Sequence, residues 1–264
     1  MADFWSGVVK CWDRYGDMYL LGAVYTLLIA LVGTFVGCVI GFAVGIVQTI
    51  PVDKKDPWLK RTVLTVVKGI LRVYVEVFRG TPMIVQAVFI YYGAIMVFDL
   101  KMGMLTAAFV IVSINTGAYM AETVRGGISS IDIGQTEGAK AIGMTHFQTM
   151  ISVILPQAFR NVIPQIGNNL IINIKDTAVL SVIGTAELFY AHKSAAGALY
   201  TFFESATILM VVYLTMTVTA SQLLRLLERR LDGDNAYDLA TTDTLAFTSG
   251  MLNYPDKKKE GGKR

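Results

Sequence analysis

The sequence predicts an all-α, polytopic membrane protein with about five transmembrane helices. Hydrophobic side chains make up 54% of its 264 residues, charged side chains make up only 16%, and the mean hydropathy is +0.53. These values depart from the composition of soluble globular proteins in the direction of a membrane protein. The apolar residues also gather in long runs without charge, which are typical of helices that cross a bilayer.

The first charge-free run extends over residues 18–52. At about 1.5 Å per helical residue it is longer than the roughly 30 Å of hydrocarbon to be crossed, so its ends are expected to lie at the interfaces. Residues 1–17 lack the basic, apolar and small-residue order of a cleaved signal peptide. We therefore expect them to form an extracytoplasmic N-terminal segment, followed by a transmembrane domain over residues 18–228.

Four further apolar segments are predicted to cross the membrane: residues 80–98, 102–121, 161–186 and 205–224. Residues 53–79 carry charges among apolar residues and are expected at the interface or buried in protein. The stretch 125–160 has no charge-free run long enough to cross, which indicates an extramembrane loop. Residues 187–203 are predicted to connect two spans on the opposite side, and residues 229–264 to form a flexible polar tail.

The distribution of basic residues predicts the orientation. With five spans, residues 53–79, the loop and the tail together hold 18 Lys and Arg, whereas the segments on the other side hold 4. Because cytoplasmic segments carry the excess of Lys and Arg, we expect the loop and the C-terminus in the cytoplasm and the N-terminus outside. The predicted location is the plasma or inner membrane of the cell.

No enzyme centre is predicted. His146 and His192 are isolated from metal-ligand spacings and nucleophiles, so both are expected to be surface residues. Cys11 and Cys38 suggest neither a disulfide framework nor a zinc site. The phosphate-binding pattern G-x-x-x-x-G-K-[ST] does not occur, so the chain itself is not expected to bind or hydrolyse ATP. No cofactor, metal or nucleic-acid partner is predicted for it.

The first span carries glycines at every fourth position, on one helix face: Gly33, Gly37, Gly41 and Gly45. Glycines at this spacing allow another helix backbone to approach closely. The simpler interpretation is a tightly packed helix within one subunit. The alternative is an interface between subunits.

The loop predicts a short helix over residues 135–144, with Glu137 near its start, where the helix dipole favours a carboxylate. Gly143 lies where helices commonly end in a left-handed turn. One face would then be small except for a single bulky side chain: Gly138, Ala139 and Ile142. A second helical pattern follows and is expected to bend at Pro156. These features fit a docking helix, although an ordinary connector of amphipathic helices remains an alternative.

The segment "EGAKAIGMTHFQTMISVILPQA" resembles the EAA loop of ABC importer permeases. In that loop Glu-Ala-Ala, three residues, Gly, nine residues and aliphatic-x-Leu-Pro follow in order. The matching residues here are Glu137, Gly138, Ala139, Gly143, Val153, Leu155 and Pro156. Gly138 departs from the usual alanine, a change that loosens a helix by roughly 1 kcal/mol. Segments 78–93, 118–128 and 174–188 resemble the polar amino-acid uptake branch, the histidine, arginine and glutamine permease type, and the similarity covers roughly residues 18–230.

The resemblance implies a type I ABC importer permease of five helices that pairs with itself or a related permease. Its implied partners are two cytoplasmic ATP-binding subunits, which would hold ATP and Mg²⁺, and an extracytoplasmic amino-acid-binding protein. In such a protein Glu137, Gly138, Ala139 and Gly143 would contact the ATPase. Leu155 and Pro156 would set the exit angle of the chain toward the next span.

Polar residues inside the fourth span are candidates for the substrate pathway: Lys175, Asp176, Asn169 and Asn173. Ionised groups in an apolar segment usually face a bundle interior, a partner or water. The alternative for Lys175 and Asp176 is a structural ion pair or contact with the interface. Glu122 and Arg125, three residues apart at the end of the third span, are expected to form a structural ion pair.

Two rival functions need no ATPase: a secondary transporter or channel, and a membrane scaffold without transport. Neither requires the spacing of the EAA loop, so this loop separates the hypotheses. No inverted pair of broken helices is evident, which weakens the secondary-transporter interpretation.

Lipid is a further expected partner, and the lysines at 257–259 favour anionic lipid, although a solvated end is the simpler interpretation.

Overall fold

The computed structural model describes residues 2–52 and 57–232. Its described residues form helices and no strands, as predicted. The chain divides into two compact units, residues 1–225 and 226–264, and every element except the end of the last helix, α9, lies in the first unit. That helix continues to Asp232, into the predicted tail, and the rest of the tail, with its lysines at 257–259, lies outside the described residues.

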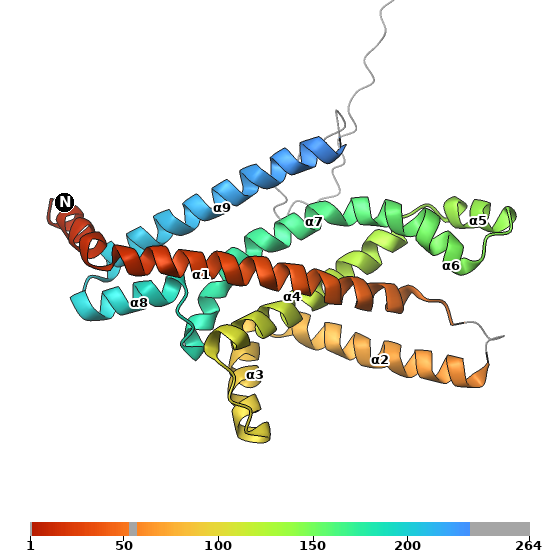
Figure 1. Cartoon of the computed structure of the whole chain (residues 1–264), viewed down its shortest axis with the longest axis horizontal. Helices are drawn as coiled ribbons and strands as arrows, with labels where there is room; N and C mark the ends of the chain where they lie inside the picture. The colour runs from red at the N-terminus through yellow and green to blue at the C-terminus, as the bar shows by residue number, and fades with distance from the viewer. Residues whose placement is uncertain (1, 53–56, 233–264) are drawn as a thin grey trace, which may run out of the picture. The chain divides into compact units, whose positions relative to one another are not determined.

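The first helix, α1, runs without interruption from Ala2 to Thr49 and ends just before Pro51 (Figure 1). Proline cannot donate a backbone hydrogen bond and disfavours helical geometry in the residue before it, so the helix ends here. Its 48 residues include the predicted N-terminal segment, which is therefore the first part of α1 and not a separate element. At about 1.5 Å per residue, α1 is far longer than the hydrocarbon core is thick.

The glycine face of α1 packs against α4, which extends from Met104 to Ser129 (Figure 1). A methyl group added at Gly41 would lie 2.3 Å from the Cβ atom of Met120, inside any normal contact distance. The same face meets α4 at three more positions: Gly33 at Val112, Gly37 at Thr116 and Gly45 at Ala121. The close approach thus lies between two helices of one chain, as the simpler of the two interpretations proposes.

Helices α2, Trp58–Gly80, and α3, Met83–Phe98, form a bent pair with an angle of 117° between them. Pro82 precedes α3 and holds an extended backbone, which separates the two helices. A buried amide stabilises the corner, because Gln86 Nε2 donates to the carbonyl oxygens of Phe78 and Thr81, each at 2.9 Å. The amide of Asn115 in α4 donates to Gln86 Oε1 at 2.8 Å, so α4 is bonded to the corner as well.

Three helices among the described residues are long and apolar enough to cross a membrane by themselves: α1, α4 and α9, which extends from Phe202 to Asp232. The bent pair raises the number to four if it forms one span. The predicted span at 161–186 corresponds to α7, Leu155–Asp176, and the 3-10 helix Thr177–Ile183. This segment is not among the helices that are apolar enough to cross a membrane, because amide and charged side chains interrupt its apolar positions.

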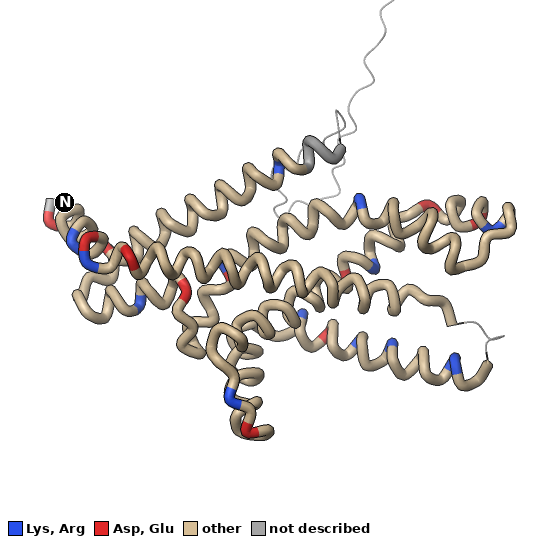
Figure 2. Tube along the Cα trace, in the orientation of Figure 1, with Lys and Arg blue, Asp and Glu red and all other residues tan. Residues whose placement is uncertain are grey.

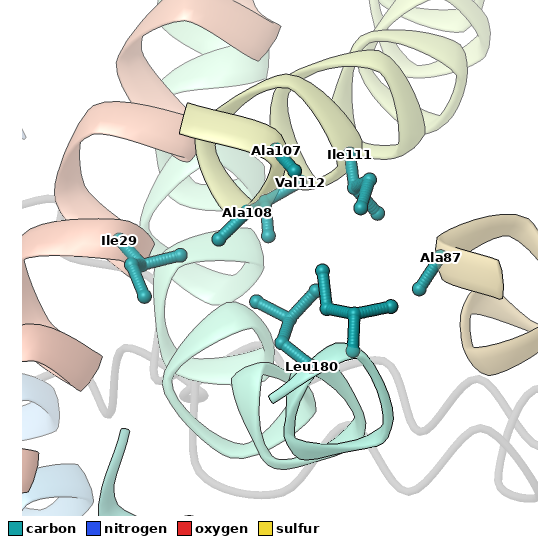
Figure 3. Close-up of a cluster of buried hydrophobic side chains, with 8 residues drawn as sticks. Ile29, Ala87, Ala107, Ala108, Ile111, Val112 and Leu180 are labelled. Carbon is teal, nitrogen blue, oxygen red and sulfur yellow. The ribbon is translucent and has the colours of Figure 1, made fainter. Parts of the chain in front are cut away.

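A buried apolar cluster joins four segments of the chain (Figure 3). Side chains from α1, α3, α4 and the 3-10 helix meet there: Ile29, Ala87, Ala107, Ala108, Ile111, Val112, Leu180 and Ile183. Alanines on α4 let the neighbouring helices approach, and the branched side chains fill the remaining space. The cluster anchors the C-terminal end of α7 through the 3-10 helix that follows it.

The predicted outward connector at 187–203 contains a helix, α8, from Leu188 to Leu199. The carboxylate of Glu187 caps its start by accepting from the backbone N–H groups of Phe189 and Tyr190, both at 2.7 Å. His192 in α8 is buried, with 3% of its surface exposed, because it packs against the start of α9, where its Nδ1 atom lies 2.7 Å from the Ser205 hydroxyl and its ring meets Phe202. The prediction that His192 is a surface residue is therefore wrong.

Candidate functional site

The loop between α4 and α7 begins with a short helix, α5, from Ile133 to Ala141. Asp132 is its N-cap, and the Asp132 Oδ1 atom accepts from the Gly134 N–H at 2.7 Å. The helix therefore starts earlier than predicted, because an aspartate at this position satisfies an unpaired N–H group. Glu137 consequently lies in the middle of α5 and not near its start.

The predicted helix end at Gly143 is confirmed. Gly143 has a φ of +84°, in the left-handed region that glycine adopts without strain. Its N–H donates to the Lys140 carbonyl at 3.0 Å, and the N–H of Met144 donates to the Ala139 carbonyl at 3.1 Å. These two bonds form the Schellman motif, which satisfies the last carbonyl groups of α5 and reverses the chain.

The exposed face of α5 is narrower than predicted. Ala139 is buried against the rest of the loop, with 6% of its surface exposed, so it does not share an outer face with Gly138 and Ile142. A Cβ atom at Gly138 would meet no other atom within 4 Å, and the Ile142 side chain is 80% exposed. Gly138, which carries no side chain, and the exposed Ile142 one helical turn later therefore form a surface that we call the outer ridge of α5.

The second half of the loop continues as one helical path into α7. The short helix α6, His146–Thr149, begins with a capping box in which Thr145 and Gln148 satisfy each other's backbone N–H groups. A π-helical segment, Met150–Ile154, then connects α6 to α7. Its wider turns lie directly before Pro156, which cannot donate to the preceding turn. The predicted break at Pro156 is therefore a local widening of the helix.

The base of the loop is attached to the transmembrane helices. The Val162 side chain and the Ala158 carbonyl of α7 lie close to Gly127 of α4, where an added methyl group would be 2.7 Å from Val162. The amide of Asn161 donates to the Ser130 hydroxyl at 3.2 Å across the same junction. The two ends of the loop, at the end of α4 and in α7, are therefore held together.

Asn173 forms a buried bridge between three helices. Its Nδ2 atom donates to the hydroxyl of Thr34 in α1 at 2.8 Å and lies 2.9 Å from the hydroxyl of Thr116 in α4. Only 4% of the Asn173 surface is exposed. The amide therefore bonds α7 to α1 and α4 and does not face an open pathway in this conformation.

The other three pathway candidates are more accessible. Lys175 and Asp176 are exposed at the C-terminal end of α7, and Asn169 is half-buried. The Asn169 Nδ2 atom donates to the Gln165 carbonyl at 3.0 Å within the same helix. The structure thus does not gather the four candidates into one site, because Asn173 lies on the packed face of α7.

The expected pair of Glu122 and Arg125 is confirmed and includes a third residue. Two guanidinium nitrogens of Arg125 donate to the Glu122 carboxylate. The Nη1 atom of Arg79 in α2 lies 3.9 Å from the same carboxylate. The acidic residue therefore connects the end of α2 to α4.

We expect replacement of Asn173 by alanine to destabilise the protein. The change would leave the hydroxyls of Thr34 and Thr116 without their buried amide partner, which costs about 1 to 2 kcal/mol. Thermal unfolding of the purified protein in detergent, followed by size-exclusion chromatography, measures the effect. Asn169→Ala is the matched control and should unfold near the wild-type temperature. Equal unfolding temperatures for both variants would contradict the bridging role.

Comparisons with known proteins agree on one family. Residues 62–233 match the model of the "binding-protein-dependent transport system inner membrane component" family. The chain is 39% identical over 228 residues to the glutamine transport system permease protein GlnP of Escherichia coli K12, covering 86% of this chain and 97% of that one. It is 31% identical to the arginine transport system permease protein ArtQ of Bacillus subtilis, covering 82% and 93%.

Solved structures have the same fold. The crystal structure of an amino acid ABC transporter with histidines superposes with a TM-score of 0.73 at 34% identity, over 83% of this chain and 96% of that one. An inward-facing structure of the MetNI methionine ABC transporter superposes with a TM-score of 0.61 at 20% identity, over 81% and 97%. The second likeness concerns the fold alone.

Proposed function

Because the chain belongs to the family of inner-membrane components of binding-protein-dependent transport systems, we propose that it is the permease subunit of an ATP-driven importer for a polar or charged amino acid. The relatives named for glutamine and arginine transport support this substrate class. The binding protein that delivers the substrate, the coupling to an ATPase and the choice of amino acid belong to the proposal.

The geometry of the loop supports coupling to an ATPase most strongly. The outer ridge of α5, formed by Gly138 and Ile142, carries an apolar side chain that is 80% exposed, the most exposed large apolar side chain of this loop. An exposed isoleucine beside a position without a side chain fits a groove of a soluble partner. The Schellman turn at Gly143 fixes the direction of the ridge, and the junction at Gly127 connects the loop to the spans.

The proposed complex contains two copies of a cytoplasmic ATP-binding subunit, a second permease copy or a related permease, and an extracytoplasmic binding protein. ATP and Mg²⁺ would be held by the ATP-binding subunits. The apolar window of α9 is only 6% buried within the chain, which leaves it free to face lipid or the second permease. The segments on the side of the loop and the tail hold 18 Lys and Arg, and those on the other side hold 4. This excess supports a cytoplasmic loop and C-terminus, with the N-terminus outside.

We expect replacement of Ile142 by aspartate to reduce retention of the ATPase about tenfold when the two are copurified, because a charge would replace an apolar contact at the centre of the proposed interface. The measurement is the ratio of ATPase to permease after affinity purification from cells that coexpress both. Leu100→Asp, at an exposed apolar residue on the side assigned to the exterior, is the control. Equal retention in both variants would refute docking through α5.

For the substrate pathway we propose contacts from Lys175, Asp176 and Asn169, with Asn173 reaching substrate only if α7 moves relative to α1 and α4. Asp176→Asn and Lys175→Met should each change the KM for uptake by about tenfold, since each removes one charged hydrogen bond. Uptake by proteoliposomes containing the complex measures this. Lys101→Met, which removes a positive charge outside the proposed pathway, is the matched control. If both pathway variants took up substrate with wild-type kinetics, Lys175 and Asp176 would have structural roles only.

A further inference from the structure

A basic cavity lies between the C-terminal ends of α1 and α4 and the middle of α2, on the side that the charge count assigns to the cytoplasm. Its volume is about 420 Å³, and four polar residues line it: Gln48, Lys68, Arg72 and Arg125. Since a water molecule takes about 30 Å³, the cavity has room for a phosphate group with bound water. It lies away from α5 and from the polar residues at the end of α7.

Within residues 2–52 and 57–232, the cations at this cavity outnumber the neighbouring acidic groups. Arg125 is paired with Glu122, and the ammonium group of Lys68 donates to the Ile50 carbonyl at the end of α1. Arg72 forms no ion pair with any other described residue, and Glu76 lies one turn further along α2. Lys68 and Arg72 are one helical turn apart, so both cations face the cavity, and no acidic residue is among the lining side chains that the structure describes.

The opposite face of α2 is apolar and exposed along its whole length: Leu59, Val63, Val66, Ile70, Val73 and Val77. Figure 2 shows the basic residues spaced along this helix. A helix with an apolar face and a Lys- and Arg-rich polar face typically lies at the boundary between headgroups and acyl chains. This arrangement would place the cavity at the level of the headgroups in the cytoplasmic leaflet.

We propose that this cavity binds the phosphate of an anionic phospholipid headgroup. Lys68 and Arg72 supply the positive charge, Arg125 supplies a further cation at the edge, and the amide of Gln48 can donate to a phosphate oxygen. Basic pockets between transmembrane helices on the cytoplasmic side commonly bind such headgroups. The lipid would bridge α1, α2 and α4 next to the Arg79–Glu122 contact.

The test measures lipid retention by the full-length chain in nanodiscs that contain phosphatidylglycerol, by native mass spectrometry. The double variant Lys68→Gln/Arg72→Gln should retain phosphatidylglycerol roughly thirtyfold less well than wild type, on the order of fivefold per cation. Arg72→Lys keeps the charge and should retain most of the lipid. The double variant Arg14→Gln/Lys101→Gln removes two cations on the other side and should bind lipid as wild type does.

Two further arms separate the sources of the phosphate. In nanodiscs of zwitterionic phosphatidylcholine, every variant should retain little lipid. Size-exclusion chromatography of the same samples checks that each variant folds. Millimolar glycerol phosphate should not displace the bound lipid; displacement would support the phosphate site but assign a soluble anion to it. Equal retention of phosphatidylglycerol by the two double variants would overturn the proposal. No transport is measured, so the result is independent of the proposed importer function.

Discussion

Replacement of Gly143 by valine is expected to abolish ATP-driven uptake while the chain still folds in the membrane. Gly143 has a φ of +84°, and a β-branched side chain there costs about 2 kcal/mol or more. The turn after α5 would rearrange, and a helix of only 9 residues is not stable without its cap. Uptake by proteoliposomes measures the loss, and size-exclusion chromatography checks folding.

Two variants control for this result. Gly143→Asn should retain much of the uptake, because asparagine tolerates the left-handed conformation far better than valine does. Gly138→Ala should keep or improve it, because this helical position has no neighbour within 4 Å and alanine favours a helix by about 1 kcal/mol. If Gly143→Val transported as well as wild type, the geometry of this turn would have no part in coupling.

Replacement of Gly41 by leucine is expected to prevent normal folding. The new Cβ atom would lie 2.3 Å from the Cβ atom of Met120 and 2.9 Å from the backbone nitrogen of Ala121. A backbone neighbour cannot rotate away, so α1 and α4 would have to separate, at a cost of about 3 kcal/mol or more. Fluorescence-detected size-exclusion chromatography should show a loss of the monodisperse peak, and any folded fraction should unfold roughly 10 °C lower than wild type.

Gly69→Leu is the matched control for this substitution. Gly69 lies inside α2, and no atom lies within 4 Å of its added Cβ. Leucine also favours a helix more than glycine does, so this variant should fold as wild type or slightly better. A Gly41→Leu variant as stable as Gly69→Leu would contradict the close packing of α1 on α4.

Features that depend on local sequence were predictable. The charge-free runs predicted most of the helices, because apolar length alone identifies a span, and the glycine at 143 predicted the end of α5 from its own conformational preference. The spacing of Glu122 and Arg125 likewise predicted an ion pair within one helix. The four glycines of α1 predicted a close helix contact but could not identify α4 as the partner.

Features that depend on tertiary contacts were not predictable. Ala139 and His192 are buried because α5 packs on the loop and the start of α9 packs on His192, and neither contact leaves a periodic signal in the short segments concerned. Asn173 resembled a pathway residue, yet it bonds to Thr34, 139 positions earlier in the chain. The cap at Asp132 could have been found, since an aspartate before a helical segment is a known start signal.

The most direct test of the importer function is uptake of labelled glutamine or arginine by proteoliposomes that contain the permease with and without its ATPase and binding protein. The complete complex should accumulate substrate only when ATP is present on the side of the α5 loop. The permease alone should give no uptake under a proton or sodium gradient. Accumulation by the permease alone, at the rate of the complete complex and without ATP, would contradict the function proposed for this chain.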